Sequence, residues 1–324
     1  MKNNIQYLII KSNFNILILL FLIFFGGCQT FSDVGDNIVK NFSAPLNVSY
    51  NVKNPVKSGV RLSALWIGHA SVLLQIYDKV IITDPLLTYN VAGVLRRNYQ
   101  PGIDINNLKQ CDIVLISHSH SDHLSLGSLG KIESKFPKTD LVFPEGVEEY
   151  LPDYSFNLHR LKMPSEEKNE YLGESVVLDS VKITCVTSRH WGGRNGIDGK
   201  LWTDQGFCAF IVQYRDVCVY ISGDSSYDPD LFEFIRKNYK IDLAVINIIY
   251  CDDCEDINQS KSHLYPMGAV KILEVTGADY MIPVHFGTFT DVNVQIPVLE
   301  KMMLQDKNLS GRIKILNLGE QVIF

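Results

Sequence analysis

The sequence lacks an excess of basic residues. Its 30 Lys and Arg are outnumbered by 36 Asp and Glu, so the formal net charge at pH 7 is -6. Proteins that bind nucleic acid through phosphate contacts concentrate Lys and Arg on their binding face, and their domains are often basic overall. The composition therefore predicts no nucleic-acid partner.

The chain also lacks an apolar run long enough to cross a bilayer. Residues 16–25 are apolar without a break, but this is only about half of the roughly 20 residues that a spanning helix needs. Lys2 and Lys11 flank the run and Gly26, Gly27 and Cys28 follow it. A basic start, a short apolar core and small residues before a break are typical of a secretory signal peptide.

The Gly-Gly-Cys ending is similar to a bacterial lipobox. We therefore expect residues 1–27 to be a lipoprotein signal peptide. Cys28 would then carry a lipid anchor that holds the protein at a membrane of the bacterial cell envelope. Phe25 stands where a lipobox usually has Leu. A cleaved soluble form and an uncleaved membrane anchor therefore stay open as alternatives.

Cysteine is scarce, with seven residues in the chain. Free cysteines are often buried as small hydrophobic residues, and we expect this of the four that lie in or beside apolar runs. Cys251 and Cys254 form a C-x-x-C pair in an acidic loop. In an exported protein this pair permits a disulfide, free thiols or a metal site. The four expected to be buried are Cys111, Cys185, Cys208 and Cys218.

Beyond residue 60 the chain contains no linker-like stretch and no short repeat. Residues 28–59 are polar and read as a tether, so we expect residues 60–324 to form one compact domain. Within it, β-rich runs alternate with helical patterns, which indicates an α/β architecture. The predicted strands are 64–67, 71–76, 80–83, 113–117, 140–143, 181–187, 207–214, 217–222, 243–249 and 280–284, and the predicted helices are 125–135, 229–238 and 266–275.

Five side chains that are able to bind metals follow predicted strands directly. Asp84, His118, His190, Asp224 and His285 each lie within about three residues of a strand end. Ligands of open α/β sheets collect at the carboxyl ends of the strands. The spacing therefore predicts that these five residues meet at one edge of the fold.

The segment from His118 to His123 is the strongest single motif. It holds four metal donors in six residues, directly after an apolar strand. Zinc prefers imidazole and carboxylate ligands. In an extended loop His118 and His120 project to the same side and can grip one ion. Asp122 and His123 can face a second ion if the chain then turns into the following helix.

This His-x-His-x-Asp-His pattern resembles the metallo-β-lactamase superfamily. The resemblance implies a four-layer αβ/βα sandwich and a hydrolase domain over residues 60–324. Asp84 matches a residue that supports the metal loop without binding the metal. The resemblance also implies two zinc ions, one on His118, His120 and His190 and the other on Asp122, His123 and His285, with Asp224 between them.

Within the superfamily, the surrounding sequence segments resemble the N-acylphosphatidylethanolamine-hydrolysing phospholipase D group. That implies phosphodiester hydrolysis of a phospholipid by a metal-bridging hydroxide, which Asp122 and Asp224 would orient. His263 matches a histidine that would contact the phosphate or protonate the leaving oxygen, with a structural role as the alternative. The segments are Trp66-Ile67-Gly68-His69-Ala70-Ser71, Ile82-Thr83-Asp84-Pro85, Arg189-His190-Trp191-Gly192-Gly193-Arg194, Leu201-Trp202, Gly223-Asp224-Ser225-Ser226-Tyr227, Asp242-Leu243-Ala244 and His285-Phe286-Gly287-Thr288-Phe289.

One segment departs from that group. The group usually reads Pro-Ile-Gly-Ala-Tyr, followed by Pro-Arg, where this chain has Asn247-Ile248-Ile249-Tyr250 and the Cys251–Cys254 loop. The departure puts the substrate in doubt. Hydrolysis of another bond, such as that of a lactone, and a metal-binding lipoprotein without catalysis remain the alternatives. Two further residues have open roles: His69 either orients a metal ligand or packs, and Arg194 either pairs with phosphate or is a surface cation.

Overall fold

The computed structural model describes residues 44–48, 52–92, 95–165, 170–194, 203–251, 253–257, 261–289 and 294–324. The predicted signal peptide, Cys28, Leu201 and Trp202 lie outside these residues. Within the described part, no helix combines the length and the hydropathy needed to cross a membrane.

The first sheet contains seven strands. Its first three consecutive strands, β1 to β3, pair antiparallel, whereas β3, β6, β7 and β8 run parallel, so the carboxyl ends of these four lie at one edge. The order is β15 (Gln321–Ile323), β1 (Leu62–Gly68), β2 (Ser71–Ile76), β3 (Lys79–Thr83), β6 (Ile113–Leu115), β7 (Asp140–Pro144) and β8 (Asn157–Leu161).

The second sheet contains six strands. Its parallel part brings the carboxyl ends of three neighbouring strands, β12, β13 and β14, to one edge. The order is β14 (Tyr280–Val284), β13 (Leu243–Asn247), β12 (Val217–Ile221), β11 (Ala209–Tyr214), β10 (Val181–Val186) and β9 (Leu172–Leu178). Two short strands, β4 (Asn90–Val91) and β5 (Leu95–Arg96), form a separate pair.

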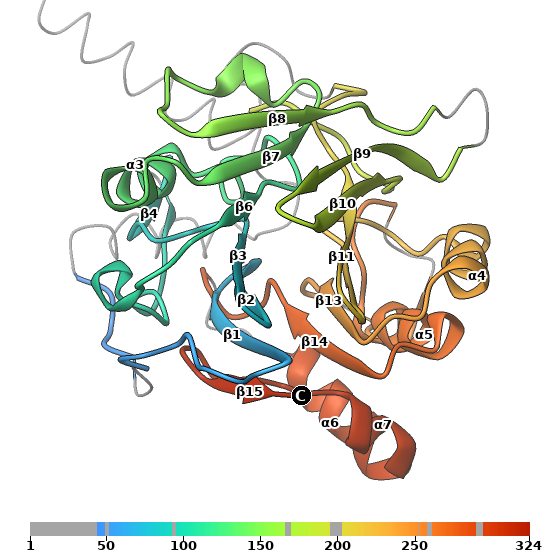
Figure 1. The fold of residues 1–324 in the computed structure, drawn as a ribbon. Coiled ribbons are helices and arrows are strands. Elements are labelled where there is room, and N and C mark those ends of the chain that lie inside the picture. The colour runs from blue at the N-terminus through green and yellow to red at the C-terminus, as the bar shows by residue number, and fades with distance from the viewer. Residues whose placement is uncertain are drawn as a thin grey trace, which may run out of the picture.

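The two sheets face each other across a shared core, and helices cover their outer faces (Figure 1). Because successive strand residues point to opposite faces, Val72 and Leu74 of β2 enter the core between the sheets. Leu73 packs on the other side with Leu129 and Ile132 of α3 (Leu126–Lys135). Two helices, α4 (Pro229–Asn238) and α5 (Pro266–Thr276), pack with the second sheet. The predicted four-layer sandwich is confirmed.

Local sequence explains where the helices begin and end. The Asp228 side chain accepts hydrogen bonds from the first turn of α4, and Pro229 follows it at the first helical position. Pro266 opens α5, and Gly277 closes it with a left-handed backbone, as the sequence predicted. Two helices near the C-terminus were not predicted, α6 (Gln295–Gln305) and α7 (Lys307–Arg312).

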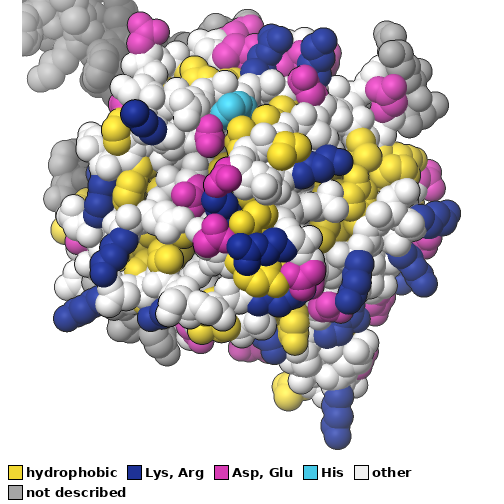
Figure 2. All heavy atoms as spheres, viewed as in Figure 1, with side chains coloured by type: hydrophobic (Ala, Val, Ile, Leu, Met, Phe, Trp, Pro, Cys, Tyr) yellow, Lys and Arg dark blue, Asp and Glu magenta, His cyan; other side chains and the backbone are white. Residues whose placement is uncertain are grey.

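The described residues before position 60 contact the domain. Leu46 pairs with Tyr99, and the Gln321 side chain donates to the carbonyl of Pro55. The packed part of the chain thus begins before residue 60. On the face shown in Figure 2, acidic and basic side chains are interspersed.

The cysteines divide into two kinds. Cys111, Cys185, Cys208 and Cys218 are buried free thiols, as predicted. Cys251 and Cys254 form a disulfide, which settles the three alternatives that the sequence left open for this pair.

Candidate metal centre

The seven predicted metal ligands meet at the edge where parallel strands of both sheets end. The loop between β6 and α3 carries four of them, and single ligands follow β10, β12 and β14. Their donor atoms fall into overlapping groups whose members lie within 4.8 Å of one another. The ligands brought together are His118, His120, Asp122, His123, His190, Asp224 and His285.

The first donor set consists of three histidines. The Nδ1 atom of His120 lies 2.9 Å from Nε2 of His118 and 3.2 Å from Nε2 of His190. The outer ring nitrogens have other partners: Ser117 Oγ is 2.9 Å from Nδ1 of His118, and the Ser262 carbonyl is 3.1 Å from Nδ1 of His190. Such outer partners fix the ring orientation of metal-binding histidines. The three inner nitrogens therefore fit a single ion.

The second donor set contains Asp122, His123 and His285. Asp122 Oδ2 lies 3.8 Å from Nε2 of each histidine. The Nε2 atoms of His123 and His285 are buried and have no hydrogen-bond partner among the described residues. Because buried polar groups normally have partners, these nitrogens suit a bound cation. His69 joins this group, with Nε2 2.9 Å from Asp122 Oδ2, so its contact favours the orienting role over simple packing.

Asp224 lies between the two donor sets. Its Oδ2 is 3.9 Å from Nε2 of both His118 and His190 and 3.4 Å from Nε2 of His123. The same oxygen lies 3.2 Å from Nε2 of His263. This carboxylate therefore lies within 4 Å of histidine nitrogens from both donor sets.

The protonation states of the first donor set suit a metal. Burial lowers the pKa of His118 well below its usual value, that of His120 to about 4 and that of His190 to about 3. These rings are neutral at pH 7, which is the form that binds metal. Burial also lowers the pKa of His123, but the carboxylates of Asp224, Asp122 and Asp84 outweigh burial and raise it well above normal. The position of His123 thus favours a positive charge.

Asp84 holds the metal loop without pointing a free oxygen at the centre. Its Oδ1 accepts from the Ser117 backbone N–H at 2.7 Å. Its Oδ2 accepts from Ser117 Oγ at 2.7 Å and lies 2.9 Å from Nδ1 of His123. Asp84, His69 and His285 all have a left-handed backbone, with φ of 38°, 54° and 75°. Such strain costs about 1–3 kcal/mol per residue and is concentrated at functional sites.

Arg194 braces the same loop from the other side. Its guanidinium donates to the carbonyls of Ser119 and Leu124 at 3.0 and 2.9 Å, and it lies 5.9 Å from the centre of the Tyr150 ring. These bonds give Arg194 a structural role beside the two that the sequence left open, a phosphate partner and a surface cation. A loop rich in glycine gave no signal that its arginine would turn inward.

Arg97 is a supporting residue that the sequence analysis missed. It is only 1% exposed and donates to the carbonyls of Leu86 and Ile67 at 2.6 and 3.2 Å. The Leu86 carbonyl lies in the turn after β3, which carries Asp84, and the Ile67 carbonyl lies near the end of β1, two residues before His69. Burial lowers the pKa of Arg97 to about 10, so it stays charged at neutral pH. Gly68 has a φ of 120°, which other residues rarely adopt, and a Cβ there would also come 2.3 Å from Nη2 of Arg97, so this position favours glycine.

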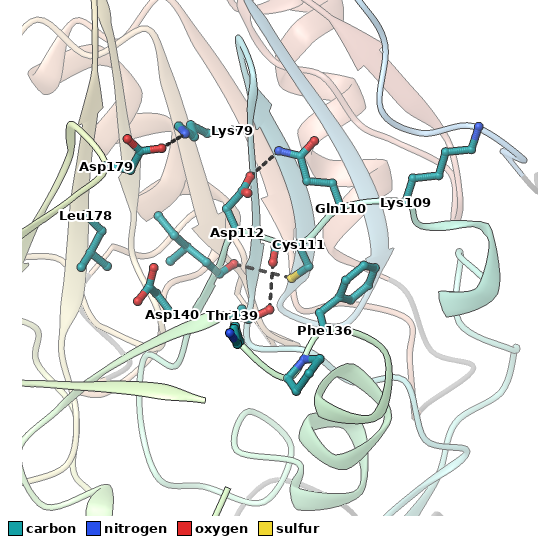
Figure 3. A pocket seen from close by; sticks show the side chains of 13 residues that line it. Lys79, Lys109, Gln110, Cys111, Asp112, Phe136, Thr139, Asp140, Leu178 and Asp179 are labelled. Atoms are coloured by element: carbon teal, nitrogen blue, oxygen red, sulfur yellow. Dashed lines mark hydrogen bonds and ion pairs between the residues drawn. The ribbon is translucent and has the colours of Figure 1, made fainter. Parts of the chain in front are cut away.

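A separate cavity of about 550 Å³ lies at the opposite edge of the first sheet, where β3, β6 and β7 begin (Figure 3). Several of its polar side chains pair with one another. Lys79 forms an ion pair with Asp179, and Gln110 donates to Asp112 at 2.7 Å. The predicted site residues do not line this cavity, so the candidate chemistry is confined to the other edge.

Two curated proteins are similar to this chain in sequence. An uncharacterised protein from Mycobacterium tuberculosis is 28% identical over 240 residues, which are 71% of this chain and 59% of that protein. A mitochondrial N-acyl-phosphatidylethanolamine-hydrolysing phospholipase D from Saccharomyces cerevisiae is 27% identical over 236 residues, 69% of this chain and 47% of that protein. The chain thus spans about half to three fifths of the length of these relatives.

A solved structure shares the fold. A metallo hydrolase from the archaeon Ignicoccus hospitalis superposes with a TM-score of 0.58 at 17% identity, covering 81% of this chain and 98% of that one. In sequence, the beta-lactamase superfamily domain matches residues 79–286, well over half of the chain and all seven predicted ligands. The chain therefore belongs to the beta-lactamase superfamily.

Proposed function

We propose that the protein is a binuclear zinc hydrolase that cleaves a phosphodiester bond in an amphiphilic lipid. The observation that carries the proposal is the pair of donor sets that share Asp224. All seven donors are imidazoles or carboxylates, which zinc prefers. A pair of bound zinc ions would supply hydroxide near neutral pH and would offset negative charge on a phosphoryl group.

The chain's own residues would hold and orient the reactants. Asp122 and Asp224 have pKa values held well below normal, because the surrounding histidines outweigh the effect of burial. They are therefore ionised at neutral pH and accept hydrogen bonds. The His263 side chain is 17% exposed and lies 3.2 Å from Asp224 Oδ2. We assign it the contact with the phosphate or the proton transfer to the leaving oxygen.

Two observations support this substrate class: the sequence segments that resemble the phospholipase D group, and the relative in yeast. That relative is named for hydrolysis of N-acyl-phosphatidylethanolamine. Trp191 stacks on His190 at 4.5 Å between ring centres and lies 6.2 Å from the ring of His263. It thus presents an apolar surface beside the candidate centre. We propose an N-acyl phosphatidylethanolamine or a related lipid as the substrate.

A comparison of kcat/KM between substrates tests the proposed substrate class. We expect kcat/KM for an N-acyl phospholipid to exceed the values for a plain phospholipid and for bis-p-nitrophenyl phosphate. We also expect His263→Ala to lower kcat/KM by about 10²-fold, the size of a general-acid contribution, and to do so mainly with the lipid substrates. Steady-state kinetics on zinc-loaded protein measure both.

His159→Ala is the control, since His159 lies on β8 and its Nε2 contacts Asp140 at 2.7 Å instead of the centre. Equal kcat/KM values for all three diesters would contradict the lipid preference. Turnover of a lactone above that of every diester would replace the phosphodiesterase with a lactonase.

We further propose that Cys28 carries a lipid anchor that keeps the domain at the membrane of the cell envelope, where a two-tailed substrate resides. Supporting this are the apolar run at 16–25 and the Gly-Gly-Cys that follows it. We expect Cys28→Ser to abolish metabolic labelling with fatty acid and to shift the protein out of the membrane fraction or leave it unprocessed. Unchanged labelling in this variant would show that the anchor is elsewhere or absent.

A further inference from the structure

Asn247 lies where β13 ends and touches the carboxylate that the two donor sets share. Its side-chain amide is 2.7 Å from Asp224 Oδ1, and the residue is only 3% exposed. A carboxylate without a proton only accepts hydrogen bonds. The group that faces it is therefore the amide nitrogen, and Asn247 donates to Asp224.

The two oxygens of Asp224 have different surroundings. Oδ1 faces the amide of Asn247 and lies 3.5 Å from Nε2 of His285. Oδ2 lies within 3.9 Å of nitrogens from both sets, including His118 and His123. A carboxylate that is free to rotate about its Cβ–Cγ bond would not keep these two environments distinct. The bond from Asn247 occupies one oxygen and thereby leaves the other at the junction of the sets.

Asn247 is itself held firmly. Its backbone N–H donates to Ser222 Oγ at 3.0 Å, which ties the end of β13 to the end of β12. The next residue, Ile248, donates its N–H to the carbonyl of Val284 at 2.9 Å. The amide donor thus stands on the ends of three neighbouring parallel strands, which is a rigid platform for fixing a side chain.

We propose that Asn247 is a positioning residue that fixes the rotation of the Asp224 carboxylate, so that Oδ2 is the oxygen shared by both metal sites. This inference rests on the proposed metal centre and not on the identity of the substrate. Removing a hydrogen-bond partner of a metal ligand typically lowers metal affinity or activity by about 10–100-fold.

The test measures zinc binding by the metal-free protein in competition with a chromophoric zinc chelator. Asn247→Leu preserves the approximate size of the side chain and removes the donor. We expect its zinc dissociation constant to rise by about 10–100-fold. We also expect the visible absorption of the cobalt-substituted protein to change, because the geometry of the shared ligand changes. A purely structural role would alter the thermal unfolding of metal-free protein but neither of these readouts.

Thr139→Val is the matched control. Thr139 is equally buried at 3% and donates a side-chain hydrogen bond to the carbonyl of Cys111 at 2.8 Å, at the opposite edge of the sheet. We expect its zinc affinity to stay within about threefold of native, since it removes a similar bond far from the centre. If Asn247→Leu fails to fold, Asn247→Ala serves in its place.

The possible outcomes separate the two proposals. A native protein that binds no zinc would overturn the proposed zinc hydrolase. A native protein that binds zinc, with Asn247→Leu or Asn247→Ala binding it within threefold and giving the same cobalt spectrum, would overturn the positioning role alone. A rise in the dissociation constant that Thr139→Val reproduces would also overturn it.

Discussion

Replacing Asp224 by alanine should abolish turnover while the fold survives. Asp224 is the donor that both sets share, so its loss weakens two metal sites at once. Removing one preorganised electrostatic group typically lowers kcat by about 10²–10³-fold, and the loss of the metal ions removes several such effects together. We therefore expect a loss of at least about 10³-fold, and His120→Ala should behave in the same way.

Metal analysis accompanies the kinetics. Native protein purified without chelator should contain about two zinc ions per chain, which the seven donors can hold as two sites that share one ligand. Asp224→Ala should contain fewer, while circular dichroism stays native and His159→Ala keeps its activity. Asp224→Ala that retained more than a tenth of native turnover without metal would rule out the proposed mechanism. Iron in place of zinc would indicate a redox member of the superfamily.

Asp84→Ala should be the most destabilising single change among the residues that support the loop. It leaves the Ser117 backbone N–H and Nδ1 of His123 without their carboxylate partner in a buried place. A buried group that loses its partner costs about 1–3 kcal/mol. We expect the free energy of unfolding of metal-free protein to fall by about 2–4 kcal/mol. We also expect zinc affinity to fall by about 10–100-fold.

Urea unfolding and zinc competition measure the two effects of Asp84→Ala. Asp84→Asn is the graded comparison, because its amide oxygen still accepts from the Ser117 N–H but one carboxylate oxygen is lost. We expect it to fall between native and Asp84→Ala in both measurements. If the urea midpoint of unfolding of Asp84→Ala equals that of the native protein, Asp84 does not hold the loop in the way that the hydrogen bonds indicate.

The strands that the sequence predicted are those buried on both faces. Every residue of β2 and β12 is buried, and such runs are continuous apolar signals. The strands it missed lie at or near sheet edges. β9 has no buried residue, and the exposed fraction of Val177 is 64%. Most side chains of β8 are exposed, so buried and exposed residues do not alternate along it. An edge strand has few buried residues to pattern, so hydrophobic periodicity does not reveal it.

The candidate site divides in the same way. The metal donors could be named from the sequence because histidine and aspartate residues follow predicted strands at a spacing that is typical of metal ligands. Arg97 and Asn247 could not, since their roles come from hydrogen bonds that only the folded chain makes: Arg97 reaches the carbonyls of Leu86 and Ile67, and Asn247 reaches the side chain of Asp224. The departure from the resembled group at Asn247 indicates a different substrate preference and gives no sign of a contact with the metal site. In the structure this residue donates to Asp224, a predicted metal ligand.

The donors come from both halves of the sandwich. His118 and His123 follow a strand of the first sheet, whereas His190, Asp224 and His285 follow strands of the second. Bound ions would therefore cross-link the two sheets at the edge where their parallel strands end. The opposite edge would be held by packing and side-chain pairs alone. Local unfolding would then differ between the two edges. The edge that holds the ions would open only after an ion dissociates.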